Sequence, residues 1–228
     1  MYQPRHFLVS DLDEIGAFVQ AVGAADLVTL GADLTPESTL APVIWDRPPS
    51  DRETDGGAPF GRLLAHVARA NEQWRSAHGA RGLAIVHGPG TYISPSWYAA
   101  KAEHGRVVPT WNYDTVHFSG TVEVIDDVEA VLSVVRRLTD RHEADAPSPW
   151  SVDDAPDQYV LGQARAIVAI VLHVDRVEAK SKMSQNRSET DREGVVDGLR
   201  ARGHAQDLLV ADAVENALRA EQARGKGQ

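Results

Sequence analysis

Apolar residues alternate with polar ones over much of the chain, and this period of two predicts β-strands. Segments rich in β-branched residues predict strands over 27–31, 39–45, 60–67, 82–87, 116–125 and 166–180. Pro42 falls inside the second of these, so it is expected at a strand end, an edge or a bulge. In 166–180 both faces are apolar, which predicts a strand buried on both sides.

A period of 3.6 residues marks fewer segments. A helix is expected from about Asp11, capped by Ser10 and followed by acidic residues that suit its positive end. A second helix is expected where Val128, Val131, Leu132, Val135 and Leu138 form one apolar stripe. The chain from Ser188 is charged and helical. Strands outnumber helices, which favours an antiparallel barrel over alternating βαβ units.

The segments between these elements are polar. Residues 46–59 hold three Asp, one Glu and a Pro-Pro pair and predict a loop, and 68–74 predict a turn or one helical turn. A proline-containing loop is expected over 146–156. No internal repeat is visible.

Composition narrows the class of protein. The 228 residues are 43% hydrophobic and 25% charged, which is enough apolar material for a core without disulfides or metals. The chain has no cysteine, and this excludes thiolate nucleophiles and Cys-based zinc sites. The N-terminus has no basic stretch followed by an apolar run, so no signal peptide is expected. We therefore expect a cytoplasmic location. The net charge of −10 weighs against non-specific nucleic-acid binding.

Several well-known chemical motifs are absent from the sequence. It contains no GxGxxG, P-loop, HExxH or GxSxG motif, and its nine histidines are scattered. No catalytic residue and no metal ligand is therefore expected.

Polar and aromatic residues gather in four short blocks, at 66–74, 88–98, 108–113 and 180–187. Trp74, Trp97 and Trp111 lie in these blocks, where an indole beside amide and hydroxyl groups suits a planar ligand. The alternative is corner packing, which we favour for Trp97; for Trp111 the two interpretations are equal. Lys180, Lys182 and Arg187 form a donor set for a phosphate or for ring carbonyl oxygens. The alternative for this block is a solvated strand end followed by a helix that Asn186 or Ser188 caps.

These blocks, together with 1–4, 116–117, Gly120 and 191–195, resemble the PaiB family of FMN-binding negative transcriptional regulators. The resemblance extends to about Leu199. It implies a mainly β fold with peripheral helices, the FMN-binding split β-barrel, and a homodimer with the flavin at the subunit interface. The expected division is a barrel domain over 1–187 with a helical appendage of the same domain over 188–228.

The resemblance also implies which residues bind FMN. They are Ser38, Thr39, His66, Ala68, Asn71, Gln73, Trp111, Asn112, Lys182, Ser184 and Gln185. One departure concerns the second strand, where relatives carry His-Leu-Pro and this chain reads Thr39-Leu40-Ala41-Pro42. If that histidine contacts flavin, binding is weaker here.

Three functions remain open from the sequence. The first is a flavin-binding regulator. The second, the alternative to it, is a flavin-dependent oxidoreductase that uses a nicotinamide nucleotide or a small-molecule substrate. The third is direct DNA binding, which the arginines within 187–203 could support. Acidic residues alternate with these arginines, so a solvated or dimer-contact helix is favoured over a recognition helix.

Overall fold

The computed structural model describes residues 1–47 and 58–225, which form two compact units. Unit 1 comprises Met1–Ser10, His87–Thr115 and the chain from Ala179, and unit 2 comprises Asp11–Val86 and Val116–Glu178. Most of the loop expected over 46–59 lies outside the described residues, as do residues 226–228. The expected domain division at residue 187 stays a prediction.

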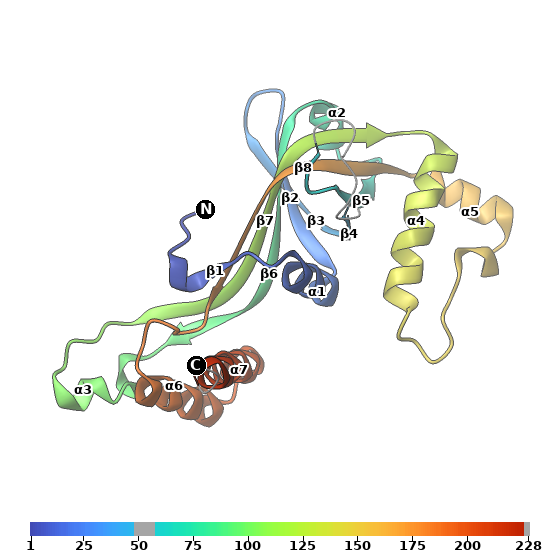
Figure 1. Cartoon of the computed structure of the whole chain (residues 1–228). Coiled ribbons are helices and arrows are strands. Elements are labelled where there is room, and N and C mark those ends of the chain that lie inside the picture. Colours follow the sequence, from blue (N-terminus) through green and yellow to red (C-terminus); the bar gives the residue numbers. More distant parts are fainter. Residues whose placement is uncertain (48–57, 226–228) are drawn as a thin grey trace. The chain divides into compact units, whose positions relative to one another are not determined.

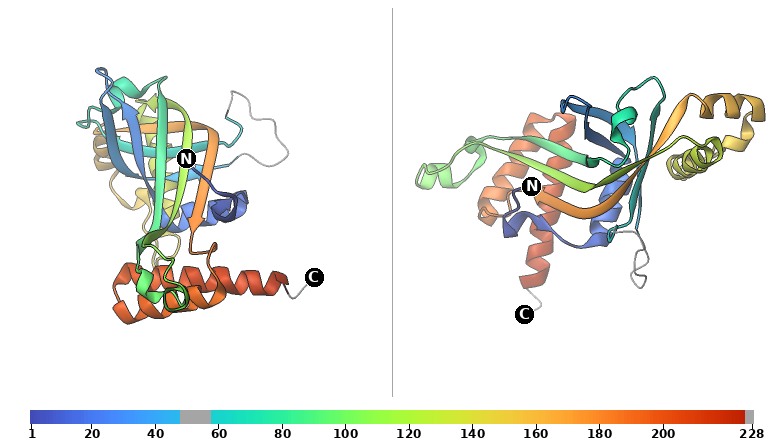
Figure 2. Two further views of the ribbon diagram at one scale, coloured as in Figure 1. Left: turned by 90° about the vertical axis from the view of Figure 1, so that its left-hand side faces the viewer. Right: turned by 90° about the horizontal axis from the view of Figure 1, so that it is seen from above.

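Within the described residues, the strands form one eight-stranded sheet of order β3-β2-β6-β7-β8-β5-β4, with β1 paired to β8 (Figure 1). The strands are β1 (Leu8–Val9), β2 (Ala24–Leu30), β3 (Pro36–Pro42), β4 (Ile44–Asp46), β5 (Arg62–Ala68), β6 (Arg81–Ile93), β7 (Thr110–Ile125) and β8 (Ile167–Lys182). Figure 2 shows the strands of unit 2 as a curled, half-closed barrel. The antiparallel barrel expected from the sequence is confirmed.

The helices belong to one unit or the other. Unit 2 holds α1 (Leu12–Val22), α2 (Trp74–Ala77), α4 (Val128–Glu143) and α5 (Asp157–Ala164), and unit 1 holds α3 (Ala100–Glu103), α6 (Glu189–Arg202) and α7 (Ala205–Gly225). Short 3-10 turns span Arg5–Phe7, Pro95–Trp97 and Val152–Asp154. Helix α5 was not predicted from the sequence, because its eight residues carry no clear apolar stripe.

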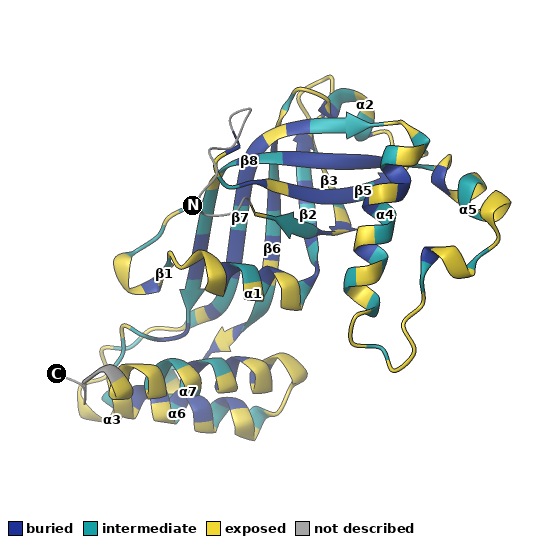
Figure 3. Cartoon of the chain, turned by 45° about the vertical axis from the view of Figure 1, so that its right-hand side comes forward, coloured by how far each residue is buried: buried dark blue, intermediate teal, exposed yellow. Residues whose placement is uncertain are grey.

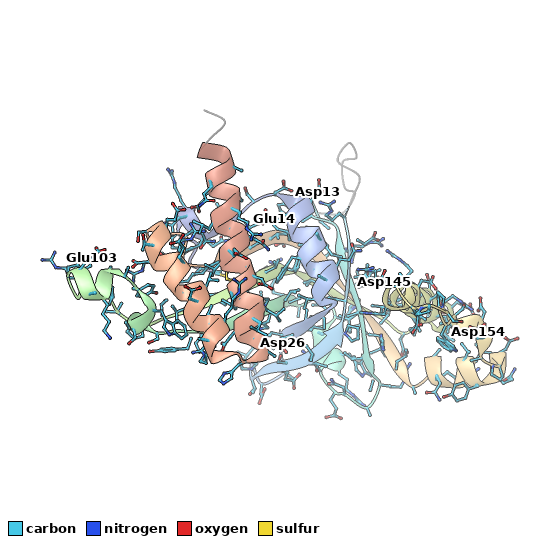
Figure 4. The ribbon with its side chains drawn as sticks, turned by 90° about the horizontal axis from the view of Figure 1, so that it is seen from below. Asp13, Glu14, Asp26, Glu103, Asp145 and Asp154 are labelled. Atoms are coloured by element: carbon cyan, nitrogen blue, oxygen red, sulfur yellow. The ribbon has the colours of Figure 1, made fainter. Side chains whose placement is uncertain are left out.

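Helix α1 begins one residue later than the sequence suggested. Asp11, not Ser10, is its cap, and the Asp11 carboxylate accepts hydrogen bonds from the backbone N–H of Asp13 (2.8 Å) and Glu14 (3.2 Å). Figure 4 shows Asp13 and Glu14 at this end of the helix, where negative charge is stabilised by the helix dipole. The expected Ser10 cap was therefore wrong by one position.

Strand β8 forms the centre of unit 2. Its residues Val168 to Leu172 are each at most 3% exposed, which confirms the prediction of a strand buried on both faces. On one side α4 packs through its apolar stripe, in which Val131, Leu132 and Leu138 are buried against strands β5 and β8 (Figure 3). The alternating pattern of buried and exposed residues on α4 follows from its period of 3.6.

The core of unit 1 lies between α6 and α7, which lie side by side (Figures 1 and 2). Val195 and Leu199 of α6 pack with Val210 and Val214 of α7. Ser188 caps α6 by accepting from the backbone N–H of Asp191 (3.2 Å), as one of the two alternatives predicted.

Several strands differ from their predicted bounds. Pro42 ends β3, which confirms one of its three expected places, and Val43 separates β3 from β4. Strands β6 and β7 are longer than predicted, since 88–93 and 110–113 continue them. Residues 88–93 contain two glycines and a proline, which interrupt the alternation that marks a strand, and 110–113 were grouped only as a polar and aromatic block.

Trp97 packs against α6, as the corner-packing interpretation predicted. A Cβ atom on Gly194 would lie 2.1 Å from the Trp97 carbonyl oxygen, and one on Gly198 would lie 2.3 Å from the indole. The two glycines therefore permit a close approach that no side chain allows.

This close approach predicts opposite outcomes for two helical glycines. Gly194→Ala should lower the free energy of unfolding, because the new methyl group meets backbone, although alanine is intrinsically favoured in helices. Gly162→Ala in α5 should raise it by up to about 1 kcal/mol, because nothing lies within 4 Å of the new Cβ. Urea unfolding of both variants measures the difference. Stabilisation by Gly194→Ala would contradict the packing.

Candidate functional site

Three of the predicted site residues in unit 2 form one hydrogen-bond network. The Thr39 hydroxyl donates to Gln73 Oε1 (2.5 Å) and accepts from Asn71 Nδ2 (2.7 Å). Gln73 is 5% exposed, and its amide also donates to the Leu27 carbonyl (2.9 Å) and the Thr29 hydroxyl (3.1 Å). Buried amides need such partners. The network therefore attaches the turn after β5 to the β2–β3 hairpin, and it satisfies both ends of the Gln73 amide.

The other three candidates in unit 2 are outside this network. Ser38 on β3 and Ala68 at the end of β5 are exposed. His66 on β5 is half-buried, and its Nδ1 atom is buried with no hydrogen-bond partner among the described residues. Burial lowers the pKa of the His66 imidazole below its usual 6.5. A neutral imidazole with an unpaired nitrogen is suited to a hydrogen bond with a ligand.

In unit 1, the predicted residues Ser184 and Gln185 build the turn that follows β8. Ser184 has a φ of 62°, a left-handed conformation, and the Arg187 N–H donates to its carbonyl (3.0 Å). The Gln185 side chain accepts from the Met183 N–H (2.7 Å) and donates to the Ser181 carbonyl (3.0 Å). Both ends of this amide are therefore engaged in the turn.

Asn112 of β7 holds the same turn. It is fully buried, and its amide donates to the Ser184 hydroxyl (2.9 Å). The neighbouring residue Trp111 points the other way and is 52% exposed. A Cβ atom on Gly90 would lie 3.0 Å from the indole nitrogen of Trp111, so the ring lies against the bare backbone of β6. The exposed indole offers a surface on which a planar ligand can stack.

Three cations lie at the end of β8 and in its turn. Lys180 and Lys182 are two residues apart on one strand, so they share a face of the sheet, and both ammonium groups lie 5.9 Å from the Phe7 ring centroid. The Arg187 guanidinium lies 4.5 Å from the centroid of the Tyr98 ring. Within the described parts of the chain, none of these three forms an ion pair with a carboxylate. We call Lys180, Lys182 and Arg187 the cation cluster.

Burial and the neighbouring charges set the electrostatics of the cluster. The pKa of Lys182 is lowered, first by burial and then by the positive charges of Lys180 and Arg187, while Tyr113 acts in the opposite direction. The Lys182 ammonium donates to the Thr110 hydroxyl, a neutral partner.

Comparison with known proteins gives these groups a context. Residues 1–176 match the model of a family described as "Putative FMN-binding domain". The chain belongs to this family. It is 28% identical over 96% of its length to the protease synthase and sporulation protein PAI 2 of Bacillus subtilis, of which it covers 99%. An uncharacterized protein of Aspergillus fumigatus is 30% identical over 78% of this chain and 82% of its own. The resemblance to the PaiB family is confirmed.

Solved structures show the same fold. An FAD- and heme-binding protein from Mycobacterium smegmatis superposes with a TM-score of 0.54 at 17% identity, covering 86% of this chain and 80% of that one. The flavocytochrome Anf3 from Azotobacter vinelandii gives 0.53 at 15% identity, covering 84% and 78%. The chain thus has the split β-barrel fold, as the sequence predicted.

The donors of each unit fit the chemistry of FMN. Unit 1 offers unpaired cations, which suit the phosphate, and an exposed indole, which suits the isoalloxazine ring. Unit 2 offers the unpaired imidazole nitrogen of His66. The remaining predicted residues Thr39, Asn71, Gln73, Asn112 and Gln185 have side-chain polar atoms engaged in hydrogen bonds within their own unit. For all eleven predicted site residues, contact with FMN stays a prediction.

Sequence reasoning did not single out Tyr98 or the aromatic residues around the two lysines. The rings of Tyr2, Phe7 and Tyr113 lie within 6 Å of Lys180. They come from positions far from β8 in the chain, so no local motif could group them.

No helix within the described ranges is long and apolar enough to span a membrane.

The lowered pKa of His66 predicts a pH dependence of stability. The unfolded chain binds a proton near pH 6.5 and the folded chain resists it, so the free energy of unfolding should fall as the pH drops below about 6.5. His66→Gln should make the decline shallower. Urea unfolding between pH 5 and 8 measures both slopes, and equal slopes for the two proteins would contradict the burial of a neutral imidazole.

Proposed function

We propose that the protein is an FMN-binding homodimer of the PaiB type that represses transcription in response to flavin or effector binding. The observation that carries this proposal is the cation cluster left without counter-ions in a chain of net charge −10, within a family of FMN-binding domains. One of these cations, Lys180, is buried, and Lys182 and Arg187 are half-buried. Positive charges removed from water without counter-ions gain when an anionic ligand neutralises them.

Dimerisation is supported by the β2–β3 hairpin. Strand β3 stands at one end of the strand order, so within the described residues one of its edges has no partner strand. Leu34 in the turn is 74% exposed and Leu40 on β3 is 70% exposed. Exposed apolar side chains beside an open edge are typical of a surface that a second subunit covers. Ser38 lies on the same face as Leu40, so a second copy there would lie next to a predicted flavin residue.

Direct DNA contact through α6 has little support. Its arginines are paired within unit 1: Arg192 with Glu221 (2.5 Å), Arg200 with Glu215 (3.0 Å) and Arg202 with Asp207 (2.6 Å). A guanidinium already paired with a carboxylate gains little from a DNA phosphate. Repression is therefore proposed to act through a partner or an effector.

The alternative function is a flavin-dependent oxidoreductase that uses a nicotinamide nucleotide or a small-molecule substrate. The unpaired nitrogen of His66 favours it, because a neutral imidazole in a partly dry site can accept or donate a proton. Bound FMN would supply the redox chemistry, and the chain would supply binding and orientation.

The proposed dimer surface predicts that Leu40→Glu lowers the mass in solution from dimer to monomer, because a charge would be buried at the contact. Tyr159→Glu on α5 is the matched control, since Tyr159 is 61% exposed and lies on another element. Sedimentation equilibrium at several concentrations measures both. A monomeric wild-type protein, or a Leu40→Glu dimer of unchanged affinity, would contradict the proposal.

The regulator and the oxidoreductase can be distinguished by how bound FMN responds to a nicotinamide reductant. For a regulator, the absorbance of bound FMN should persist on anaerobic addition of NADH or NADPH, and deletion of the gene should raise the transcripts that the protein represses. Rapid bleaching by either nucleotide with unchanged transcripts would favour the oxidoreductase and reject the regulator.

A further inference from the structure

A cavity in unit 2 lies apart from the residues expected to bind FMN. It has a volume of about 330 Å³ and lies between helix α1, the segment from Val43 to Arg47, and Arg141 of helix α4. All of its lining residues belong to unit 2. None of the eleven expected FMN residues, all of which the structure describes, lines it. The cavity is therefore a candidate site for a second ligand.

The inner end of the cavity is apolar and one of its walls is aromatic. Val19 of α1 and Val43 are at most 4% exposed, so the cavity reaches the core of unit 2. The indole N–H of Trp45 donates to the Phe60 carbonyl (2.8 Å), and the ring packs edge-on against Phe118. The indole is thus held in place before any ligand binds. Such a surface suits the apolar or aromatic body of a small molecule.

Two arginines and one carboxylate supply the charge of the cavity. At its exposed mouth, the Arg47 guanidinium pairs with Asp13 of α1 (2.6 Å; Asp13 is labelled in Figure 4). Arg141 donates to the backbone carbonyl of Gln20 (3.1 Å), and the Gln20 amide oxygen, when turned toward it, accepts from the same guanidinium (2.8 Å). Both partners are neutral, and Arg141 pairs with no carboxylate of the described chain. The lining therefore carries an excess of one positive charge.

Gly16 of α1 keeps the space beside Arg47 open. A Cβ atom at this position would lie 3.8 Å from the guanidinium carbon of Arg47, which is an ordinary contact, and would meet no other described residue outside α1 within 4 Å. Packing therefore does not require glycine here, although glycine weakens a helix relative to alanine. The bare backbone leaves this volume to a ligand.

We propose that this cavity binds a small monocarboxylate with an apolar or aromatic body. The planar guanidinium of Arg141 presents paired N–H donors that match the two oxygens of one carboxylate. A single negative charge balances the excess positive charge of the lining. A phosphate monoester fits less well, because its second negative charge would meet the carboxylate of Asp13.

The volume sets the size of the ligand, and the proposed regulation gives it a role. At about 30 Å³ for each water molecule, a cavity of about 330 Å³ suits a ligand of roughly ten non-hydrogen atoms. Such a molecule would be the effector of the proposed regulator, and in this role the inference rests on the proposed function. Binding itself requires only the residues of the cavity.

Benzoate, phenylacetate and hexanoate test the site, and the corresponding amides are uncharged probes of similar shape. NMR titration of the full chain should show that at least one carboxylate binds and that its amide binds about tenfold more weakly, because the amide lacks the charge. Arg141→Gln should weaken the carboxylate by a similar factor and leave the amide unchanged. Arg136→Gln is the matched control, since Arg136 lies on the same helix, pairs with Asp153 (3.0 Å) and does not line the cavity.

Gly16→Leu is a second variant that fills the cavity without removing a charge. It should abolish carboxylate binding, because its side chain enters the space beside Arg47. Gly162→Leu on α5 is its control, since nothing lies within 4 Å of the new Cβ atom, and it should bind as the wild-type protein does. Urea unfolding verifies that each variant is folded.

FMN titration and transcript measurements on the same proteins separate this inference from the proposed function. Carboxylate binding that depends on Arg141 and Gly16, in a protein that neither binds FMN nor represses, would leave the site standing and reject the proposed function. FMN binding and repression without binding of any of the three carboxylates would overturn the site alone. Equal effects of Arg141→Gln and Arg136→Gln, or equal affinity for carboxylate and amide, would also overturn it. Binding that leaves the repressed transcripts unchanged would reject the effector role.

Discussion

Strand β8 meets two opposite physical demands along its length. Its residues Val168 to Leu172 are buried on both faces, so they must be apolar. Its last residues, Lys180 to Lys182, carry ammonium groups that no carboxylate of the described chain neutralises. The strand therefore supplies buried apolar residues to unit 2 and the unpaired lysines Lys180 and Lys182 to unit 1. The turn at Ser184 then places Arg187 after them in the chain. The proposed ligand chemistry depends on this uncompensated charge.

The polar residues of the candidate site fall into two groups with different physical roles. Gln73, Asn112 and Gln185 have their amides engaged by partners in their own unit, so they hold turns and strands in place. His66, in contrast, keeps a buried ring nitrogen without a hydrogen-bond partner among the described residues. Such an atom loses free energy until a ligand arrives, which makes His66 the stronger candidate for contact.

Net acidity and local positive charge are compatible in this protein because some cations are paired with carboxylates and others are not. Arg200 and Arg202 are paired with carboxylates of the same helical pair. The lysines of β8, Lys180 and Lys182, pair with no carboxylate of the described residues, and they lie against aromatic rings. A DNA duplex requires an exposed basic face, whereas Lys180 is only 8% exposed. A regulator that senses a ligand fits this distribution better than one that contacts DNA.

The sequence by itself determined the elements that a strong period defines. The stripe of α4 and the two-sided apolar run of β8 were predicted because side-chain burial follows directly from those periods. The ordered polar blocks were enough to indicate the family and FMN.

Tertiary structure decided the rest. The division of polar residues into engaged and unpaired, the rings of Tyr2 and Phe7 near Lys180, and the close approach of Trp97 to Gly194 all depend on segments far apart in the chain. Periodicity and local motifs carry no information about which distant groups meet, because those contacts are set by the packing of whole elements.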